Sequence, residues 1–217
     1  MPDSRSRFTI PDHDPRSPIN DPRKTIPEKR SIMIISQAKR KENIAEYLLY
    51  MWQVEDIIRA YNLDIEKIKT AIIDHYDVDE KTRKEIIDWW EGLIMMMQHE
   101  SKQQSGHLQI NKNVLIRLND LHAELLKSPK HPEYGAEFYK TLPFIVELRA
   151  KTPESQQVDE LETCFNALYG TLLLKLQGKE MSKDTQVAIA QISHFIGTLA
   201  AYYKKNEESP IFADDIQ

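Results

Sequence analysis

The sequence lacks long apolar runs and has a single cysteine, so it does not show the usual features of membrane-anchored, secreted or disulfide-linked proteins. Its one cysteine, Cys164, excludes an internal disulfide and favours a reducing compartment. No apolar run approaches the ~20 residues that a membrane-spanning helix needs. The first residues lack the apolar core of a secretory signal. These absences predict a cytoplasmic protein without a membrane anchor.

The common signatures of catalytic and cofactor sites are also missing. The chain has no Walker loop, no Gly-x-Gly-x-x-Gly and no Gly-x-Ser-x-Gly, which removes the positive support for nucleotide binding and for a hydrolase elbow. A di-iron bundle needs Glu-x-x-His motifs, and none occurs. One cysteine and scattered histidines do not make a zinc site. We therefore expect no cofactor and no metal, and the sequence favours a protein that is not an enzyme.

Charge is unevenly distributed along the chain. The net charge is −5, yet residues 1–32 carry seven basic and five acidic residues, so the rest of the chain is more acidic than the total suggests. Nucleic-acid binding requires clustered Lys and Arg to neutralise phosphates. An acidic body therefore argues against nucleic acid as a partner.

The N-terminal segment, residues 1–32, differs in composition from the body. Its first thirty residues hold six of the eleven prolines and few large apolar side chains, which predicts a disordered tail because little surface can be buried. Two alternatives stay open: Met33 is the true start codon and the tail is an annotation artefact, or the tail is a docking peptide. We expect residues 206–217 to form a flexible acidic end.

Residues 33–205 predict an all-α, single, bundle-like domain of about seven helices, because apolar residues recur every three or four positions. Pro143 predicts a kink or a fresh start within one helix, and Asn111 is the expected N-cap of another. The predicted helices cover about 36–61, 65–75, 77–105, 111–128, 133–151, 158–177 and 182–205.

Four segments of this body resemble a known family. They read KRKENIAEYLLYMWQVEDIIRAY (39–61), GHLQINK (106–112), LPFIVELRAK (142–151) and ELETCFNALYGTLLLKLQ (160–177). Together they resemble an uncharacterised family of Bacteroides-type bacteria, domain of unknown function 4924, over residues 33 to about 205. The resemblance implies an all-helical cytoplasmic protein and supplies no activity, partner or site residue.

The most site-like cluster lies on the first helix, where Trp52, Glu55, Asp56 and Arg59 share one side at positions i, i+3, i+4 and i+7. Two carboxylates, a guanidinium and an indole are able to grip a polar ligand between helices. The simpler interpretation is a Glu55–Arg59 surface pair with Trp52 packed on a neighbouring helix. If these charges are buried, they must be paired.

Other candidates are weaker. Arg117 and His122, separated by four residues, match the spacing of helical HEPN-type ribonucleases, but such a pair arises about once by accident in a chain of this length. His107 in SGHLQIN suggests a polar patch or simple local packing. Cys164 sits between apolar positions and is expected to be buried and inert.

The third helix carries Met95, Met96 and Met97 after Trp89 and Trp90, which makes it apolar on two faces. Such a helix is central or lies at a subunit interface. The sequence therefore favours a non-enzymatic helical interaction or regulatory protein that associates with itself or with a protein partner. A small-ligand sensor using the Trp52 cluster, and a ribonuclease using Arg117 and His122, are the alternatives.

Overall fold

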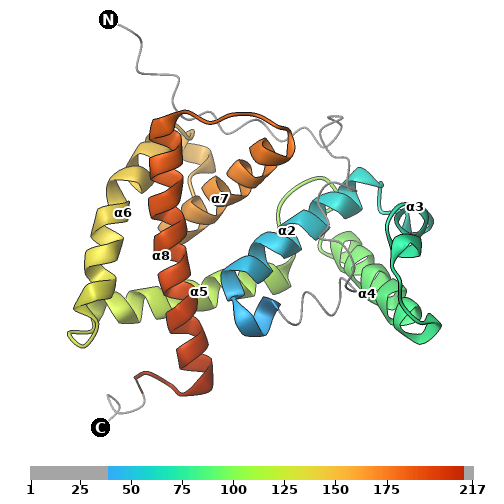
Figure 1. Cartoon of the computed structure of the whole chain (residues 1–217), viewed down its shortest axis with the longest axis horizontal. Coiled ribbons are helices and arrows are strands. Elements are labelled where there is room, and N and C mark those ends of the chain that lie inside the picture. The colour runs from blue at the N-terminus through green and yellow to red at the C-terminus, as the bar shows by residue number, and fades with distance from the viewer. Residues whose placement is uncertain (1–38, 213–217) are drawn as a thin grey trace, which may run out of the picture. The chain divides into compact units, whose positions relative to one another are not determined.

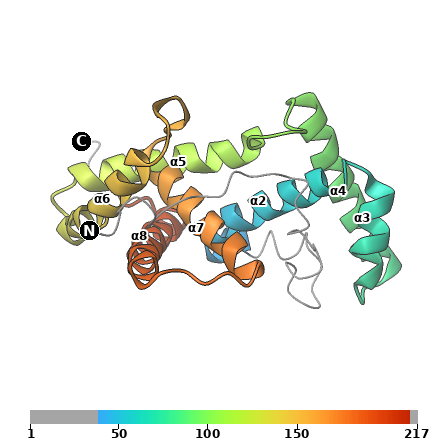
Figure 2. The same cartoon turned by 90° about the horizontal axis from the view of Figure 1, so that it is seen from above.

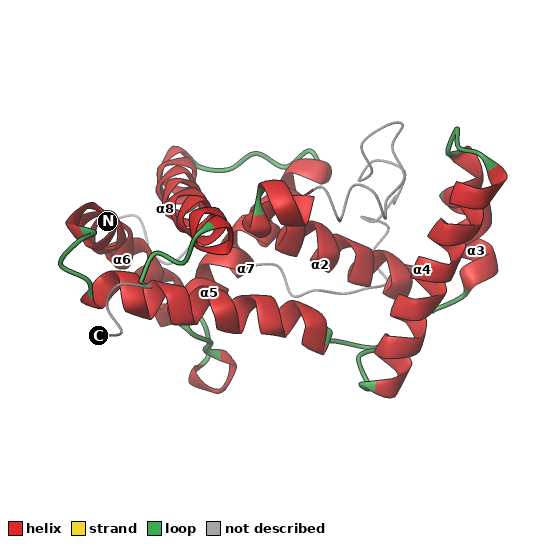
Figure 3. Cartoon of the chain, turned by 90° about the horizontal axis from the view of Figure 1, so that it is seen from below, coloured by secondary structure: helices red, strands yellow, loops and turns green. Residues whose placement is uncertain are grey.

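The computed structural model describes residues 39–212, and every regular element in that range is helical (Figure 3). The α-helices are α2 (Ile44–Ala60), α3 (Ile65–Ala71), α4 (Glu80–His99), α5 (Gln109–Lys127), α6 (Pro132–Ala150), α7 (Glu160–Leu176) and α8 (Lys183–Glu208), with 3-10 turns η3 (Ile73–His75) and η4 (Glu154–Gln156). The all-α prediction is confirmed for these residues. The predicted tail, residues 1–32, lies outside them, as does the last part of the acidic end.

The described residues fall into two compact units, with the boundary after Val114 inside α5. The N-terminal unit, residues 39–114, contains α2 to α4 and the first turns of α5. Within it, α3 and η3 pack against α4 (Figure 1). Arg83 of α4 fastens this packing, since its guanidinium donates to the carbonyls of Ile73 (2.9 Å) and Tyr76 (3.0 Å).

The C-terminal unit, residues 115–212, is built on α6, α7 and α8, each of which contacts the other two (Figures 1 and 2). Its buried core includes Leu161 and Phe165 of α7 and Phe195 of α8, all fully buried. An ion pair between Arg149 and Glu160 (2.9 Å) joins α6 to α7. Apolar burial therefore holds this unit together, and polar links fix the helix ends.

Short polar side chains set the helix starts, as local sequence rules require. Each accepts a hydrogen bond from a backbone amide of the first turn: Asn43, Asp64, Asp79, Asp159 and Ser182. The predicted unbroken first helix is wrong, because Asn43 adopts an extended conformation and separates helical residues 39–42 from α2.

Pro143 does not interrupt its helix. The prediction of a fresh start there is wrong, since α6 runs without a break from Pro132 to Ala150. The proline lies on the exposed side of α6. The missing hydrogen bond therefore falls on a solvent-facing side, where water can satisfy the freed carbonyl.

Cys164 is fully buried in α7, as predicted. Burial raises the pKa of its thiol to about 12, with Asp159 and Glu160 adding to the effect. The reactive thiolate is therefore scarce at pH 8. We expect a thiol-specific reagent to leave the folded chain unlabelled at pH 8 and to label one thiol per chain after denaturation. Rapid labelling of the folded chain would contradict this.

Candidate functional site

Glu55 is a buried carboxylate on α2 whose side chain is 1% exposed. Its Oε1 accepts from the backbone amide of Leu108 (2.9 Å) and from Nδ2 of Asn111 (2.7 Å). Its Oε2 lies 2.6 Å from Nδ1 of His107. A buried carboxylate is tolerated only when its lone pairs are used in this way.

The carboxylate also completes the start of α5. The first amides of a helix have no partner inside it, and the helix dipole favours negative charge there. The amide of Leu108 donates to Glu55, and the amide of Gln109 donates to Glu100 (2.7 Å). The predicted role of Asn111 as N-cap is wrong, because this residue lies inside α5 and is buried against Glu55.

Arg59, one turn further along α2, holds the segment that leads into α5. Its Nε donates to the carbonyl of Lys102 (3.2 Å), and its Nη2 donates to the carbonyl of Gly106. Its Nη1 pairs with Asp56 at 2.9 Å. Gly106 has φ +79, a backbone conformation that favours glycine. Arg59 therefore binds a turn whose shape depends on Gly106.

The ring of His107 stacks on the indole of Trp52, with centroids 4.1 Å apart and planes 12° from parallel. This contact completes a group that we term the Glu55 cluster: Trp52, Glu55, Asp56, Arg59, His107 and Asn111. The predicted surface pair between Glu55 and Arg59 is wrong. Both charges are buried and paired with other groups, as burial requires.

The Glu55 cluster fixes residues 102–111 onto α2 within the N-terminal unit. Glu55 receives three donors, and Arg59 reaches two carbonyls and one carboxylate. A ligand bound here would have to compete with the protein's own backbone for these groups. The ligand hypothesis for Trp52, Glu55, Asp56 and Arg59 stays a prediction. Residues 39–212 contain no group of three or more His, Cys, Asp or Glu placed to hold a metal ion.

Arg117 and His122 lie on different sides of α5, about 140° apart around the helix axis. Arg117 is exposed, whereas His122 is 8% exposed. The His122 ring lies edge-on to Phe138 and Phe195, and its Nδ1 is 2.6 Å from the hydroxyl of Tyr134. This placement does not bring the two residues together on one surface, as a shared reaction would require.

His122 should make the protein sensitive to acid. Burial lowers the pKa of its ring below the ordinary 6.5, despite the opposing charges of Glu160 and Asp159. The unfolded chain therefore binds a proton more readily than the folded chain. The contribution of neutral His122 to the free energy of unfolding is complete above pH 6.5. It falls as the pH drops towards the lower pKa of the folded state, by at most about 1.4 kcal/mol per pH unit.

The measurement is the free energy of unfolding between pH 7.5 and 5 for the native chain and for His122→Gln, which has no titrating ring. We expect the variant to lose less stability over this range. An identical pH dependence in the two proteins would contradict the assignment.

The outward face of α6 is the second candidate site. Tyr139 is 67% exposed and Val146 is 58% exposed, and they lie seven residues apart on one side of the helix. Of the eight exposed α6 residues, only Glu133 and Lys140 are charged. The other six are apolar and are spaced by four and three residues in turn: Pro132, Ala136, Tyr139, Pro143, Val146 and Ala150.

The opposite side of α6 carries the buried residues Tyr134, Phe138, Ile145 and Leu148. The helix is therefore apolar both towards the core and towards solvent. An interruption at Pro143, as predicted, would divide the outward apolar series into two short pieces. The signal was present in the sequence, because the two apolar series each keep one phase along the whole helix.

The methionine run of α4 is less exposed than the outward face of α6. Met97 is buried, Met96 and Trp89 are partly buried, and Met95 is 62% exposed. The three consecutive methionines thus point to different sides, as helix geometry dictates. Only one of them offers a large exposed apolar surface.

A family model described as a domain of unknown function, number 4924, matches residues 33–209. No curated protein and no solved structure matches the chain. Among the described helices, none is both long and apolar enough to cross a membrane.

Proposed function

We propose that this chain, which belongs to the family of domain of unknown function 4924, is a non-enzymatic interaction protein that binds a helix of a protein partner through the outward face of α6. The observation that supports the proposal is the exposed apolar series on this helix. We also propose that the protein has a regulatory role, lies in the cytoplasm and comes from Bacteroides-type bacteria.

A helix that is apolar on two opposite sides is typical of one that is covered on both. Tyr139 and Val146 would bury large apolar areas in a complex, and tyrosine is enriched where interfaces carry most of their binding energy. The alternation of four and three residues is the spacing that inserts side chains between those of a facing helix. A helical partner therefore fits the face better than an extended peptide does.

The Glu55 cluster supports the same proposal indirectly. Its charged groups hydrogen-bond to residues 102–111, and a ligand would have to compete with these bonds. The candidate catalytic pair, Arg117 and His122, is divided between an exposed and a buried position. The outward face of α6 carries Tyr139 and Val146, two of the exposed large apolar residues of the described chain, and this supports a partner there.

Site-specific photo-crosslinking in cells that express the full chain tests this proposal. Benzoylphenylalanine replaces Tyr139 in one protein and the exposed Lys84 of α4 in a matched control. We expect a discrete covalent adduct at position 139 and none at position 84. Mass spectrometry of the adduct identifies the partner.

A third protein adds Val146→Glu to the position 139 probe. If the adduct depends on the outward face, this change should remove it, because a buried unpaired carboxylate opposes binding. An adduct that persists, or equal adducts at positions 139 and 84, would overturn the proposed function.

A further inference from the structure

We infer that the helix bound by the outward face of α6 is α6 of a second copy of this chain, arranged antiparallel across a two-fold axis. This inference rests on the proposed function and names the partner. In such a pair the same surface must complement itself, so each large side chain needs a small or matching one opposite. The outward face of α6 has that property.

The apolar series provides the shape complementarity. With the two-fold axis between Pro143 and Val146, each of these residues faces the other in the second copy. Tyr139 then faces Ala150, so the largest side chain of the series meets one of the smallest. Packing of large against small residues lets two helices approach closely.

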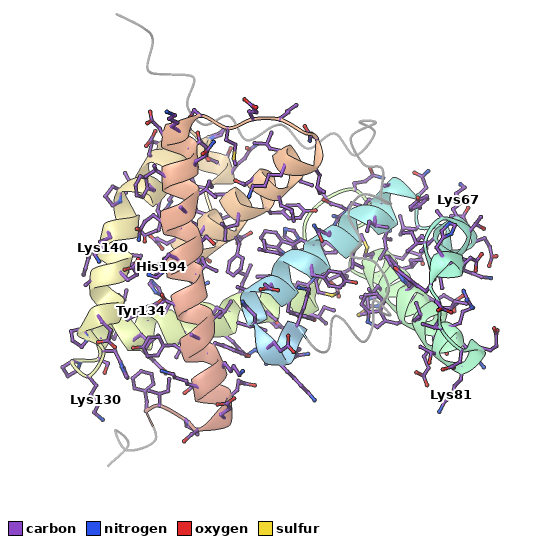
Figure 4. All side chains as sticks on the ribbon, viewed as in Figure 1. Lys67, Lys81, Lys130, Tyr134, Lys140 and His194 are labelled. Atoms are coloured by element: carbon purple, nitrogen blue, oxygen red, sulfur yellow. The ribbon has the colours of Figure 1, made fainter. Side chains whose placement is uncertain are left out.

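Charge supplies the second argument. Lys140 lies beside the apolar series, with Glu133 and Glu147 one heptad before and after it along the same edge of α6. Figure 4 shows Lys140 on α6, next to the helix that carries His194. An edge that carries both signs can pair with itself when two copies run antiparallel.

The charges also select the register. If the axis lay between Tyr139 and Pro143, the two copies of Lys140 would face each other. Moving the axis to lie between Pro143 and Val146 instead places Lys140 opposite Glu147 of the second copy, twice by symmetry. This register includes both Tyr139 and Val146, the two most exposed large apolar residues of α6.

A shift towards the other end of α6 would pair Lys140 with Glu133. That carboxylate already accepts a hydrogen bond from the hydroxyl of Tyr202, which also lowers the pKa of Glu133. Among the described residues, Glu147 pairs with Lys151, the C-cap of α6, at 2.8 Å, whereas Glu133 also lies 3.6 Å from His131. Glu147 is therefore the freer of the two acids to pair across the axis.

Sedimentation velocity of the full chain, over about 1–100 μM, tests the inference. We expect a concentration-dependent dimer. Lys140→Glu and Glu147→Lys should each weaken it about tenfold, because each replaces two attractive contacts with two repulsive ones. The double variant K140E/E147K should restore the dimer, and K140E/E133K should not.

Val146→Lys serves as the disrupting control and should reduce association at least about a hundredfold. Circular dichroism confirms that each variant stays folded. A strict monomer over the whole range, or a dimer indifferent to Val146→Lys, would overturn the inference. If the wild-type chain is monomeric and position 139 still crosslinks a different protein, the second copy is excluded while the proposed function stands.

Discussion

Replacing Glu55 with alanine should destabilise the N-terminal unit by about 3–5 kcal/mol, a large part of the stability of a typical domain. The change removes the acceptor for the Leu108 amide, the Asn111 amide and the His107 ring at once. Donors left buried without a partner lose their solvation and gain nothing in return. The start of α5 also loses a negative charge that its dipole favours.

Denaturant unfolding followed by tryptophan fluorescence measures this effect. All three tryptophans, Trp52, Trp89 and Trp90, lie in the N-terminal unit, so the signal reports on that unit alone. Glu91→Ala, on the exposed side of α4, is the matched control and should change stability by less than about 0.5 kcal/mol. Equal effects of the two substitutions would mean that Glu55 is not a structural anchor.

Replacing Arg59 with methionine should cost the same unit about 2–4 kcal/mol. Methionine keeps much of the apolar stem but loses the hydrogen bonds to the carbonyls of Lys102 and Gly106 and the ion pair with Asp56. Lysine at position 59 should recover less than half of the loss, because it has no planar fork to reach two carbonyls and a carboxylate together.

Amide hydrogen exchange separates this role from general packing. We expect Arg59→Met to speed exchange at residues 102–108 more than in α2, since the guanidinium holds residues 102–106 through two carbonyls. Lys84→Met, at an exposed position of α4, is the control and should leave exchange at residues 102–108 unchanged. Uniform acceleration across the whole unit would contradict the assigned contact.

Local rules predicted the helices well, because the interactions that start a helix act within a few residues. Asp64 and Ser182 cap their helices through amides two or three positions away. The expectation of a fresh start at Pro143 was wrong because it ignored exposure, and α6 runs on through this residue. Pro143 lies on the solvent side of α6, and the packing of Tyr134, Phe138 and Ile145 on the opposite, buried side outweighs one missing hydrogen bond.

The candidate sites show what local rules miss. Spacing on one helix placed Trp52, Glu55, Asp56 and Arg59 on one side and required their charges to be paired if buried. It did not supply the partners, since Glu55 meets Leu108 across 53 residues of chain. The spacing of apolar residues in the sequence does indicate the outward face of α6. A helix divided at Pro143, however, is too short to show a seven-residue repeat.

The most direct test of the central claim, that the outward face of α6 is covered when the protein works, is maleimide labelling in intact cells. One chain carries Tyr139→Cys and a second carries Glu85→Cys on the exposed side of α4, both with Cys164→Ser. Each is labelled in cells and again as dilute purified protein. We predict that Cys at position 139 reacts at least about tenfold more slowly in cells than in dilution, relative to position 85, as expected for a buried interface position. Equal relative rates in the two settings would contradict the account.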